Sequence, residues 1–180
     1  MKKGKKPARK AATKKAAPKK AKTAKKVSPI PRGFRTVTPH LVVRGAAQAI
    51  DFYKKAFGAK ELLRMPMPDG SVAHAEIQIG DSRLMLADES PQMGASAPQT
   101  VGGTCVHIFL YLKDVDKAFA QATAAGATTE MPPTDMFWGD RYCKLLDPFG
   151  HKWNMATHKE DLTPKEMARR GAEAAQKPQG

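Results

Sequence analysis

The sequence of 180 residues has only two cysteines, Cys105 and Cys143, and no long apolar run. The two cysteines lie far apart and lack the CxxC or Cys/His spacing of a zinc or redox site, so we expect two reduced thiols in the core. A membrane span needs about 18 apolar residues in a row, and a secretory signal about 7 to 15 behind a basic start. Neither is present, and we therefore expect a cytoplasmic protein with no membrane partner.

Acidic residues are missing from the first 35 positions, which hold fifteen of the 31 Lys and Arg residues. The other 145 residues carry sixteen basic and seventeen acidic side chains, so the formal net charge of +14 belongs to the N-terminal segment. Residues 1–26 are nearly all Lys, Ala, Pro and Thr without an aromatic residue, a composition that cannot offset its ordering entropy. We predict a disordered basic tail and linker over residues 1–33, in which Ser28, Pro29 and Pro31 form a stiff linker.

The composition of the tail resembles that of the Lys/Ala/Pro tails of linker histones and bacterial histone-like proteins. This resemblance implies binding to nucleic acid without sequence preference, and an association with the nucleoid. The alternative is a tail that only keeps the protein in solution. The candidates for phosphate contacts are Lys2, Lys3, Lys5, Lys6, Arg9, Lys10, Lys14, Lys15, Lys19, Lys20, Lys22, Lys25 and Lys26.

Residues 34–158 predict the same order of elements twice, a strand, a helix and three strands. In the first half, the pattern predicts a strand over 36–43 and a helix over 46–57 that ends at Gly58. Strands over 61–67, 72–79 and 83–88 follow, separated by turn sequences at 68–70 and 80–82. In the second half we expect a strand over 105–112, a helix over 115–125 ended by Gly126, and strands near 128, over 142–146 and over 152–156.

The length of this repeat indicates two modules and excludes a solenoid. Gly58 and Gly126 lie 68 residues apart, which is longer than solenoid repeats. We predict an α+β fold in which two βαβββ modules, about 36–90 and 103–157, form a cupped mixed sheet around one cavity. Residues 159–180 are expected to be a short C-terminal helix and tail, because Thr163 and Glu166 match a capping box with Pro164 at the first helical position.

Three segments carry a resemblance to a known family: AIDFYKKAFGAK at 49–60, HAEIQIGDSRLMLADE at 74–89 and WGDRYCKLLDPFGHKW at 138–153. In this order they resemble the vicinal-oxygen-chelate superfamily of glyoxalase, bleomycin-resistance and dioxygenase proteins, in its PhnB-like branch. The resemblance covers about two thirds of the chain. It implies paired modules, a homodimer and a cup that binds a metal or a small molecule, but the fold alone does not settle which.

Metal-dependent members of the family take their ligands from the first and last strands of each module, and these places fall on Thr38, Met85, His107 and Asn154. Only His107 is a usual ligand of zinc, nickel or iron, whereas a thioether and a neutral amide are poor ones. We therefore expect no metal at this place and no cofactor. A divalent metal remains the alternative only in a rearranged site, built from His40, His74, Glu76 or His107.

Polar side chains within the predicted strands mark the candidate ligand site. His74 and Glu76 share one strand face with Gln78, and this face lines the cavity, meets a dimer partner or faces solvent. The catalytic residues are unknown, and the candidates for a general base are Glu76, if an apolar cup raises its pKa, and His107. The candidate ligand-binding residues are Thr38, His40, His74, Met85, His107, Trp138, Arg141 and Asn154.

The loop over residues 136–141 places aromatic surface beside a charged pair, just before a predicted cavity strand. Trp138 would stack on a flat ligand and Arg141 would hold an anionic group. The alternative is a turn stabilised by Asp140 and Arg141, with Trp138 as a packing lid. Residues 147–150, DPFG, are typical of a turn, and Trp153 is expected in the core.

Three classes of function remain open. The first, which we favour, is a protein that binds a small, flat, anionic molecule in its cup without the usual metal site. The second is a lyase, isomerase or dioxygenase with a rearranged metal site. The third is a nucleic-acid-associated protein that acts through its basic tail.

Overall fold

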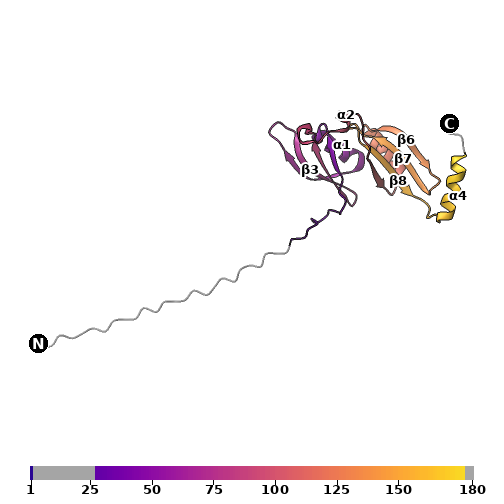
Figure 1. The fold of residues 1–180 in the computed structure, drawn as a ribbon, viewed down its shortest axis with the longest axis horizontal. Coiled ribbons are helices and arrows are strands. Elements are labelled where there is room, and N and C mark those ends of the chain that lie inside the picture. Colours follow the sequence, from indigo (N-terminus) through magenta and orange to yellow (C-terminus); the bar gives the residue numbers. More distant parts are fainter. Residues whose placement is uncertain (2–26, 177–180) are drawn as a thin grey trace.

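The computed structural model describes Met1 and residues 27–176 (Figure 1). The basic tail over residues 2–26, with all thirteen candidates for nucleic-acid binding, lies outside the described residues. Within the part that the structure describes, no helix is long and apolar enough to cross a membrane. A linker over residues 27–39 leads into the first strand.

The first module consists of β1 (His40–Val43), α1 (Ala46–Phe57), β2 (Lys60–Pro66), β3 (Val72–Ile79) and β4 (Ser82–Asp88). Its four strands form one sheet in the order β1-β4-β3-β2, in which β1 is parallel to β4 and the other pairs are antiparallel. Gly58 ends α1 in the left-handed conformation, with φ 64°, and its N–H donates to the carbonyl of Tyr53. Glycine adopts this conformation without steric penalty, which is why the helix ends there.

The second module repeats this plan with β5 (His107–Tyr111), α3 (Val115–Ala124), β6 (Thr128–Asp135), β7 (Asp140–Leu146) and β8 (Lys152–His158). Its sheet has the order β5-β8-β7-β6, with β5 parallel to β8. A 3-10 turn, η1 (Pro91–Met93), and the short helix α2 (Pro98–Val101) connect the modules. The predicted α+β fold with two βαβββ modules is confirmed, and the cup consists of two separate four-stranded sheets.

The first strand of each module begins later than predicted, because local hydrogen bonds of side chains replace the strand ladder. The hydroxyl of Thr38 donates to the carbonyl of Arg35, and the hydroxyl of Thr104 donates to the carbonyl of Val106. The prediction of two core thiols is wrong for Cys105, which lies in this second irregular segment and is exposed. Cys143, on β7, is buried as expected.

One hydrophobic core joins the two modules on the side of the helices, where α1 packs against α3. This core includes one buried polar contact. The carboxylate of Asp147 accepts from the Tyr53 hydroxyl at 2.8 Å and from the Trp153 indole at 2.9 Å. The rings of Tyr53 and Trp153 lie 5.3 Å apart. Asp147 therefore satisfies two buried donors at once, and the DPFG turn has the structural role expected for it.

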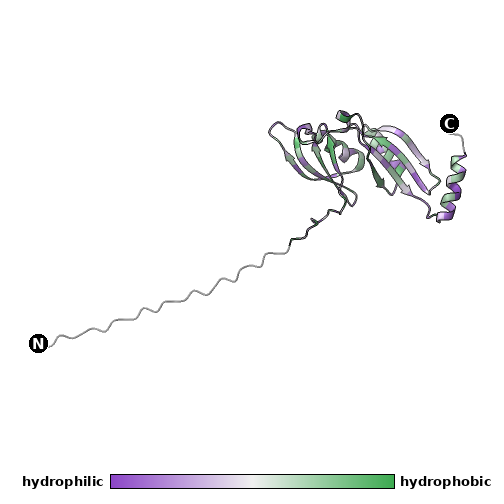
Figure 2. Cartoon of the chain, viewed as in Figure 1, coloured by the Kyte–Doolittle hydropathy of each residue, from purple (hydrophilic) through white to green (hydrophobic). Residues whose placement is uncertain are grey.

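Each sheet buries one face and leaves the other face open. Hydrophobic and hydrophilic residues alternate along several of the strands (Figure 2). On β3, buried Ile77 and Ile79 alternate with half-buried Glu76 and Gln78. We define the first open face by His40 (β1), Arg83 and Met85 (β4), and His74 and Glu76 (β3). The second open face is defined by His107, Phe109 and Tyr111 (β5), Tyr142 and Lys144 (β7), and Asn154 (β8).

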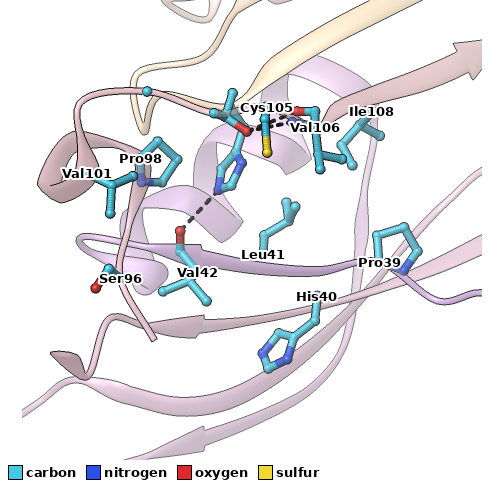
Figure 3. A pocket seen from close by; sticks show the side chains of 13 residues that line it. Pro39, His40, Leu41, Val42, Ser96, Pro98, Val101, Cys105, Val106 and Ile108 are labelled. Carbon is cyan, nitrogen blue, oxygen red and sulfur yellow. Dashed lines mark hydrogen bonds between the residues drawn. The ribbon is translucent and has the colours of Figure 1, made fainter. Parts of the chain in front are cut away.

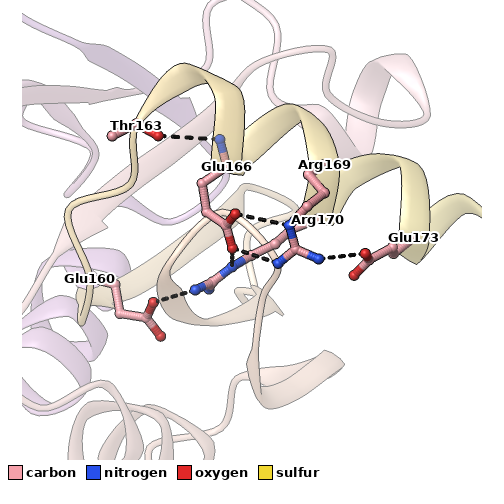
Figure 4. A network of polar contacts seen from close by, with 6 residues as sticks. All are labelled: Glu160, Thr163, Glu166, Arg169, Arg170 and Glu173. Atoms are coloured by element: carbon pink, nitrogen blue, oxygen red, sulfur yellow. Dashed lines mark hydrogen bonds and ion pairs between the residues drawn. The ribbon is translucent and has the colours of Figure 1, made fainter.

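The C-terminal helix α4 (Pro164–Ala175) lies at the outer end of the second module and buries none of its residues. Thr163 caps it by accepting from the N–H of Glu166, as the capping box predicted. Glu166 also accepts from Arg169 and Arg170, and Arg170 reaches Glu160 before the helix (Figure 4). The pairs of Glu166 stabilise the helix itself, while the Arg170–Glu160 pair and the close approach of Phe137 to Gly171 connect it to the preceding segment. Each surface ion pair contributes little on its own.

Candidate ligand-binding site

The second open face carries a cluster of aromatic side chains, formed by Phe109, Tyr111, Trp138 and Tyr142. Phe109 and Tyr111 are 44% and 66% exposed, although both come from a regular strand. Phe109 lies 4.8 Å from Tyr111 and 5.9 Å from Tyr142 between ring centroids, and Trp138 meets Tyr142 edge-on at 5.7 Å. Trp138 is half-buried and Tyr142 is buried, so the exposed part of this group is formed by Phe109 and Tyr111. We call the four rings together the aromatic cluster.

A buried carboxylate, that of Asp140, fixes the polar ends of this cluster. Asp140 is 4% exposed and accepts from the Tyr111 hydroxyl at 3.2 Å, the Trp138 indole at 3.1 Å and Nδ1 of His158 at 2.8 Å. The hydrogen bond to Asp140, and a second one to Asp161, raise the pKa of His158. The side chains of Tyr111, Trp138 and His158 are thereby all bonded to the one carboxylate of Asp140.

His107 and Asn154, two of the candidate ligand-binding residues from the sequence, lie on the same open face as the aromatic cluster. His107 is exposed at the start of β5. Asn154 on β8 stands opposite Phe109 on one side and Lys144 on the other. Its Oδ1 is buried and has no hydrogen-bond partner among the described residues. A buried polar atom without a partner is unfavourable, and a half-turn of the amide would offer it to a ligand.

The first open face brings His40, His74, Glu76 and Met85 together. The imidazoles of His40 and His74 meet edge-on with ring centroids 6.2 Å apart, and Nε2 of His74 lies 3.7 Å from Oε1 of Glu76. Burial, and then the neighbouring His74, lower the pKa of His40. His40 is therefore neutral at physiological pH, able to accept or donate one hydrogen bond.

Thr38 and Met85 line a pocket of about 330 Å³ between the linker and β4. The hydroxyl of Thr38 is already bonded to the backbone, and Met85 offers only a thioether. The other two places at which the family holds a metal, His107 and Asn154, belong to the second sheet. This donor set does not fit a zinc, nickel or iron ion, because one imidazole is its single strong ligand.

Arg141 lies on the helix side of its sheet, away from the aromatic cluster. Its guanidinium donates to Asp116 of α3 at 2.6 and 2.7 Å and to Asp135 at 3.2 Å. These contacts raise the pKa of Arg141, and the hydrogen bonds with Asp116 are the main cause. The placement favours a structural role for Arg141, tying β7 to α3, over the expected role as an anchor for an anionic ligand.

A further pocket, of about 360 Å³, lies between β1 and β5, which are edge strands of the two sheets (Figure 3). The exposed thiol of Cys105 and the side chains of Val106 and Ile108 line one side of it. On the other side, Nε2 of His151 donates to the carbonyl of Val42 and so links the two modules. His40, a candidate ligand-binding residue from the sequence, also lines this pocket, but the pocket itself depends on how the two modules pack.

Sequence reasoning also missed Phe109, Tyr111 and Tyr142. The signal was available, since alternation along HIFLY places His107, Phe109 and Tyr111 on one strand face. That segment resembled a buried strand because all its residues except His107 are apolar or aromatic. Asp140 was seen only as part of a turn, because its three donors come from positions 111, 138 and 158.

Comparisons with known proteins agree with this architecture. Residues 34–155 match the model of the Glyoxalase/Bleomycin resistance protein/Dioxygenase superfamily. An uncharacterized protein of Mycobacterium tuberculosis strain H37Rv is 51% identical over 122 residues, which cover 66% of this chain and 72% of that protein.

Among solved structures, TioX from Micromonospora sp. ML1 has 32% identity and a TM-score of 0.56, and the match covers 67% of this chain and 96% of TioX. The PhnB protein from Bacillus cereus is similar in fold, with 16% identity and a TM-score of 0.54, over 68% of this chain and 99% of that one. With its two βαβββ modules and this match over residues 34–155, the chain belongs to the glyoxalase/bleomycin resistance/dioxygenase superfamily.

Proposed function

We propose that this chain is a binding protein for a small, flat, anionic molecule, which it holds in its cup without the usual metal site. The observation that carries the proposal is the aromatic cluster, fixed through Tyr111 and Trp138 to the buried carboxylate of Asp140. Exposed aromatic surface that is held in one arrangement is typical of ligand sites. It loses little conformational entropy when a ligand stacks on it.

The chemistry around the aromatic cluster supports a ligand that is flat and partly polar. Aromatic pairs contribute about 0.5–1.5 kcal/mol beyond the area that they bury, so two stacked rings supply useful affinity. His107, Lys144 and Asn154 surround the rings with hydrogen-bonding groups. Met85 on the first open face adds an adaptable apolar wall.

We extend the proposal to a homodimer. The edge strand β2 of the first sheet exposes two large apolar side chains, Leu63 at 42% and Met65 at 53%. A second copy of the chain would bury these residues and close the cup. Light scattering at micromolar concentration should give twice the mass of one chain, and a monomer would contradict this part of the proposal.

The test of small-molecule binding uses the full chain, purified without chelator and examined by native mass spectrometry and metal analysis. We expect well under one metal ion per chain, because three of the four family places lack a strong donor and tight sites need roughly 10 kcal/mol from theirs. Trp138→Ala and His107→Ala should weaken binding of the fluorescent probe N-phenyl-1-naphthylamine by about three- to tenfold, at 0.5–1.5 kcal/mol per contact.

Met93→Ala is the matched control, since Met93 is 85% exposed and lies in η1 between the modules, outside both open faces. Circular dichroism should show that all three variants remain folded. Probe binding that is equal in the native protein, Trp138→Ala and His107→Ala would exclude the aromatic cluster as the site.

A second candidate function is a metal-dependent lyase, isomerase or dioxygenase with a rearranged site. The grouping of His40, His74 and Glu76 on the first open face favours it, because imidazole and carboxylate are the usual metal ligands. One equivalent of tightly held metal, lost when His107→Ala is combined with His40→Ala or Glu76→Ala, would establish this function and overturn the first.

A third candidate, association with nucleic acid, rests on the thirteen Lys and Arg residues at positions 2–26. Such a segment is expected to bind phosphates without sequence preference, whatever the domain behind it does.

A further inference from the structure

Arg83 is a half-buried cation on the first open face, and the described residues satisfy it only in part. Its side chain is 24% exposed, and Nη1 makes one long contact, at 3.4 Å, to Oε2 of Glu76. The guanidinium carbon lies 4.8 Å from the centre of the Phe34 ring. Among the described residues, no hydrogen bond is formed by Nε or Nη2 of Arg83.

Arg141, the other arginine considered as a ligand anchor, already has carboxylate partners for its guanidinium. Three of its nitrogens donate to two carboxylates at 2.6 to 3.2 Å. A guanidinium has five N–H donors in a fixed fork and binds an oxyanion best through two of them at once. Among the described residues, Nε and Nη2 of Arg83 form no hydrogen bond, whereas Nε, Nη1 and Nη2 of Arg141 all do.

The linker holds Arg83 in place. The backbone of Gly33 lies so close that a Cβ there would come within 2.6 Å of both Nε and Nη2, and its φ of +88° also favours glycine. The N–H of Phe34 donates to the carbonyl of Pro31, which turns the Phe34 ring toward Arg83. Phe34, which Arg83 contacts, and Met85, two residues further along β4, both line the pocket of about 330 Å³.

We propose that Arg83 is the anion-binding residue of the cup and that the linker around Phe34 closes over the anionic group of the ligand. The ligand class is a flat apolar molecule with one oxyanion, such as a carboxylate or a phosphonate. The apolar part would fill the pocket against Phe34 and Met85, while the oxyanion accepts from Nε and Nη2. This inference rests on the proposed small-molecule function of the cup, and it adds an anion site on the first open face that is distinct from the aromatic cluster on the second.

The carboxylate of Glu76 would weaken anion binding, because it competes with the ligand for the guanidinium of Arg83. It lies between Nη1 of Arg83, at 3.4 Å, and Nε2 of His74, at 3.7 Å, and neither contact is short. Removing its charge should therefore strengthen the binding of an anion. A general base or a metal ligand at this position would show the reverse, a loss of function.

The experiment compares two fluorescent probes that differ by one sulfonate group, uncharged N-phenyl-1-naphthylamine and anionic 8-anilinonaphthalene-1-sulfonate. In Arg83→Met, affinity for the sulfonate should fall about tenfold or more, as expected for hydrogen bonds to a charged group. Affinity for the uncharged probe should stay within about twofold, because Met preserves the apolar stem of the side chain. Arg83→Lys, which keeps the charge but loses the fork, should be intermediate.

Three further variants complete the set. Glu76→Gln should bind the sulfonate several-fold more tightly and the uncharged probe as before. Phe34→Ala should weaken sulfonate binding about two- to fivefold, the effect of one partly exposed cation–π contact. Val37→Ala, in the same linker but 82% exposed, is the control and should change neither affinity.

The two probes also separate this inference from the proposed function. If Arg83→Met weakens both probes equally, or Glu76→Gln weakens the sulfonate, Arg83 has a structural role and the inference is wrong, while binding to the aromatic cluster stands. If the native protein binds neither probe, the proposed function fails and the inference fails with it. Thermal unfolding followed by circular dichroism checks that each variant is folded.

Discussion

Replacing Asp140 with Asn removes the buried charge that fixes the aromatic cluster. Tyr111 and Trp138 both donate to Oδ2 of Asp140, so the amide oxygen can accept from both as a neutral group, while the NH₂ group faces Nδ1 of His158. Hydrogen bonds to charged groups contribute about 1.5–3 kcal/mol and neutral ones about 0.5–1.5 kcal/mol, so each of these two bonds weakens by about 1 kcal/mol. We expect Asp140→Asn to lower the free energy of unfolding by about 1–3 kcal/mol.

The assay is thermal unfolding followed by circular dichroism, together with tryptophan fluorescence. A loss of this size corresponds to a fall in Tm of roughly 3 to 10 °C for a domain of this length. The emission maximum of Trp138 should shift as its indole loses the charged acceptor. The emission of Trp153, which is fully buried and bonded to Asp147, should not shift. Trp138→Phe in the same background separates the two signals.

Asp161→Asn is the matched control, because Asp161 is fully exposed and contacts only the other nitrogen of His158. Its Tm should stay close to that of the native protein. Equal losses in Asp140→Asn and Asp161→Asn, or no loss in either, would refute the claim that Asp140 organises the cluster.

The hydrogen bond between Asp140 and His158 makes the stability of the protein depend on pH. Its pKa in the folded protein is raised above the usual 6.5, mainly by the hydrogen bond to Asp140 and then by that to Asp161. The stabilisation is therefore complete below about pH 6.5 and is lost as the pH rises through the raised pKa. In Asp140→Asn this dependence should become smaller, which urea unfolding between pH 6 and pH 9 will measure. An unchanged pH dependence would mean that Asp140 is not its cause.

Three other predictions concern the core, a turn and the tail. Tyr53→Phe should destabilise the protein by about 1–2 kcal/mol in urea unfolding, because buried Asp147 loses one of its donors. Gly139→Ala should destabilise by about 1–3 kcal/mol, since its φ is +94° and the added Cβ would lie 2.6 Å from the carbonyl oxygen of Glu160. The full chain should bind duplex DNA with a log–log salt slope approaching about −12 if all thirteen tail cations engage, and a slope shallower than about −3 would argue against tail-driven binding.

The fold was predictable from the sequence because its signals are local and occur twice. Apolar periodicity, the helix-ending Gly58 and Gly126 and the turn sequences each act within a few residues, and the repeat confirms their order. The starts of β1 and β5 were not predictable in the same way. There the hydroxyls of Thr38 and Thr104 bond to nearby carbonyls, and this local competition with the strand ladder is not visible in a hydrophobic pattern.

The candidate site was predictable only in part, because it depends on which face of a strand each side chain occupies. His74 and Glu76 share an open face, as alternation required, and Trp138 and Asn154 lie with the aromatic cluster or beside it. Arg141 was expected at the mouth of the cavity on the basis of its neighbour Trp138. Trp138 lies in a turn, however, so alternation along β7 does not relate the two residues.

The two arginines show what decides whether a cation is free to bind a ligand. Arg141 and Arg83 both stand on internal strands, and Tyr142 or Leu84 follows them directly, so their sequence context is similar. The difference comes from residues distant in sequence. Arg141 faces α3, where Asp116 neutralises it, while Arg83 faces the cup, where Glu76 reaches it only at 3.4 Å. The partners of a charge, and thus its availability to a ligand, follow from the packing of helix against sheet and not from the strand pattern alone.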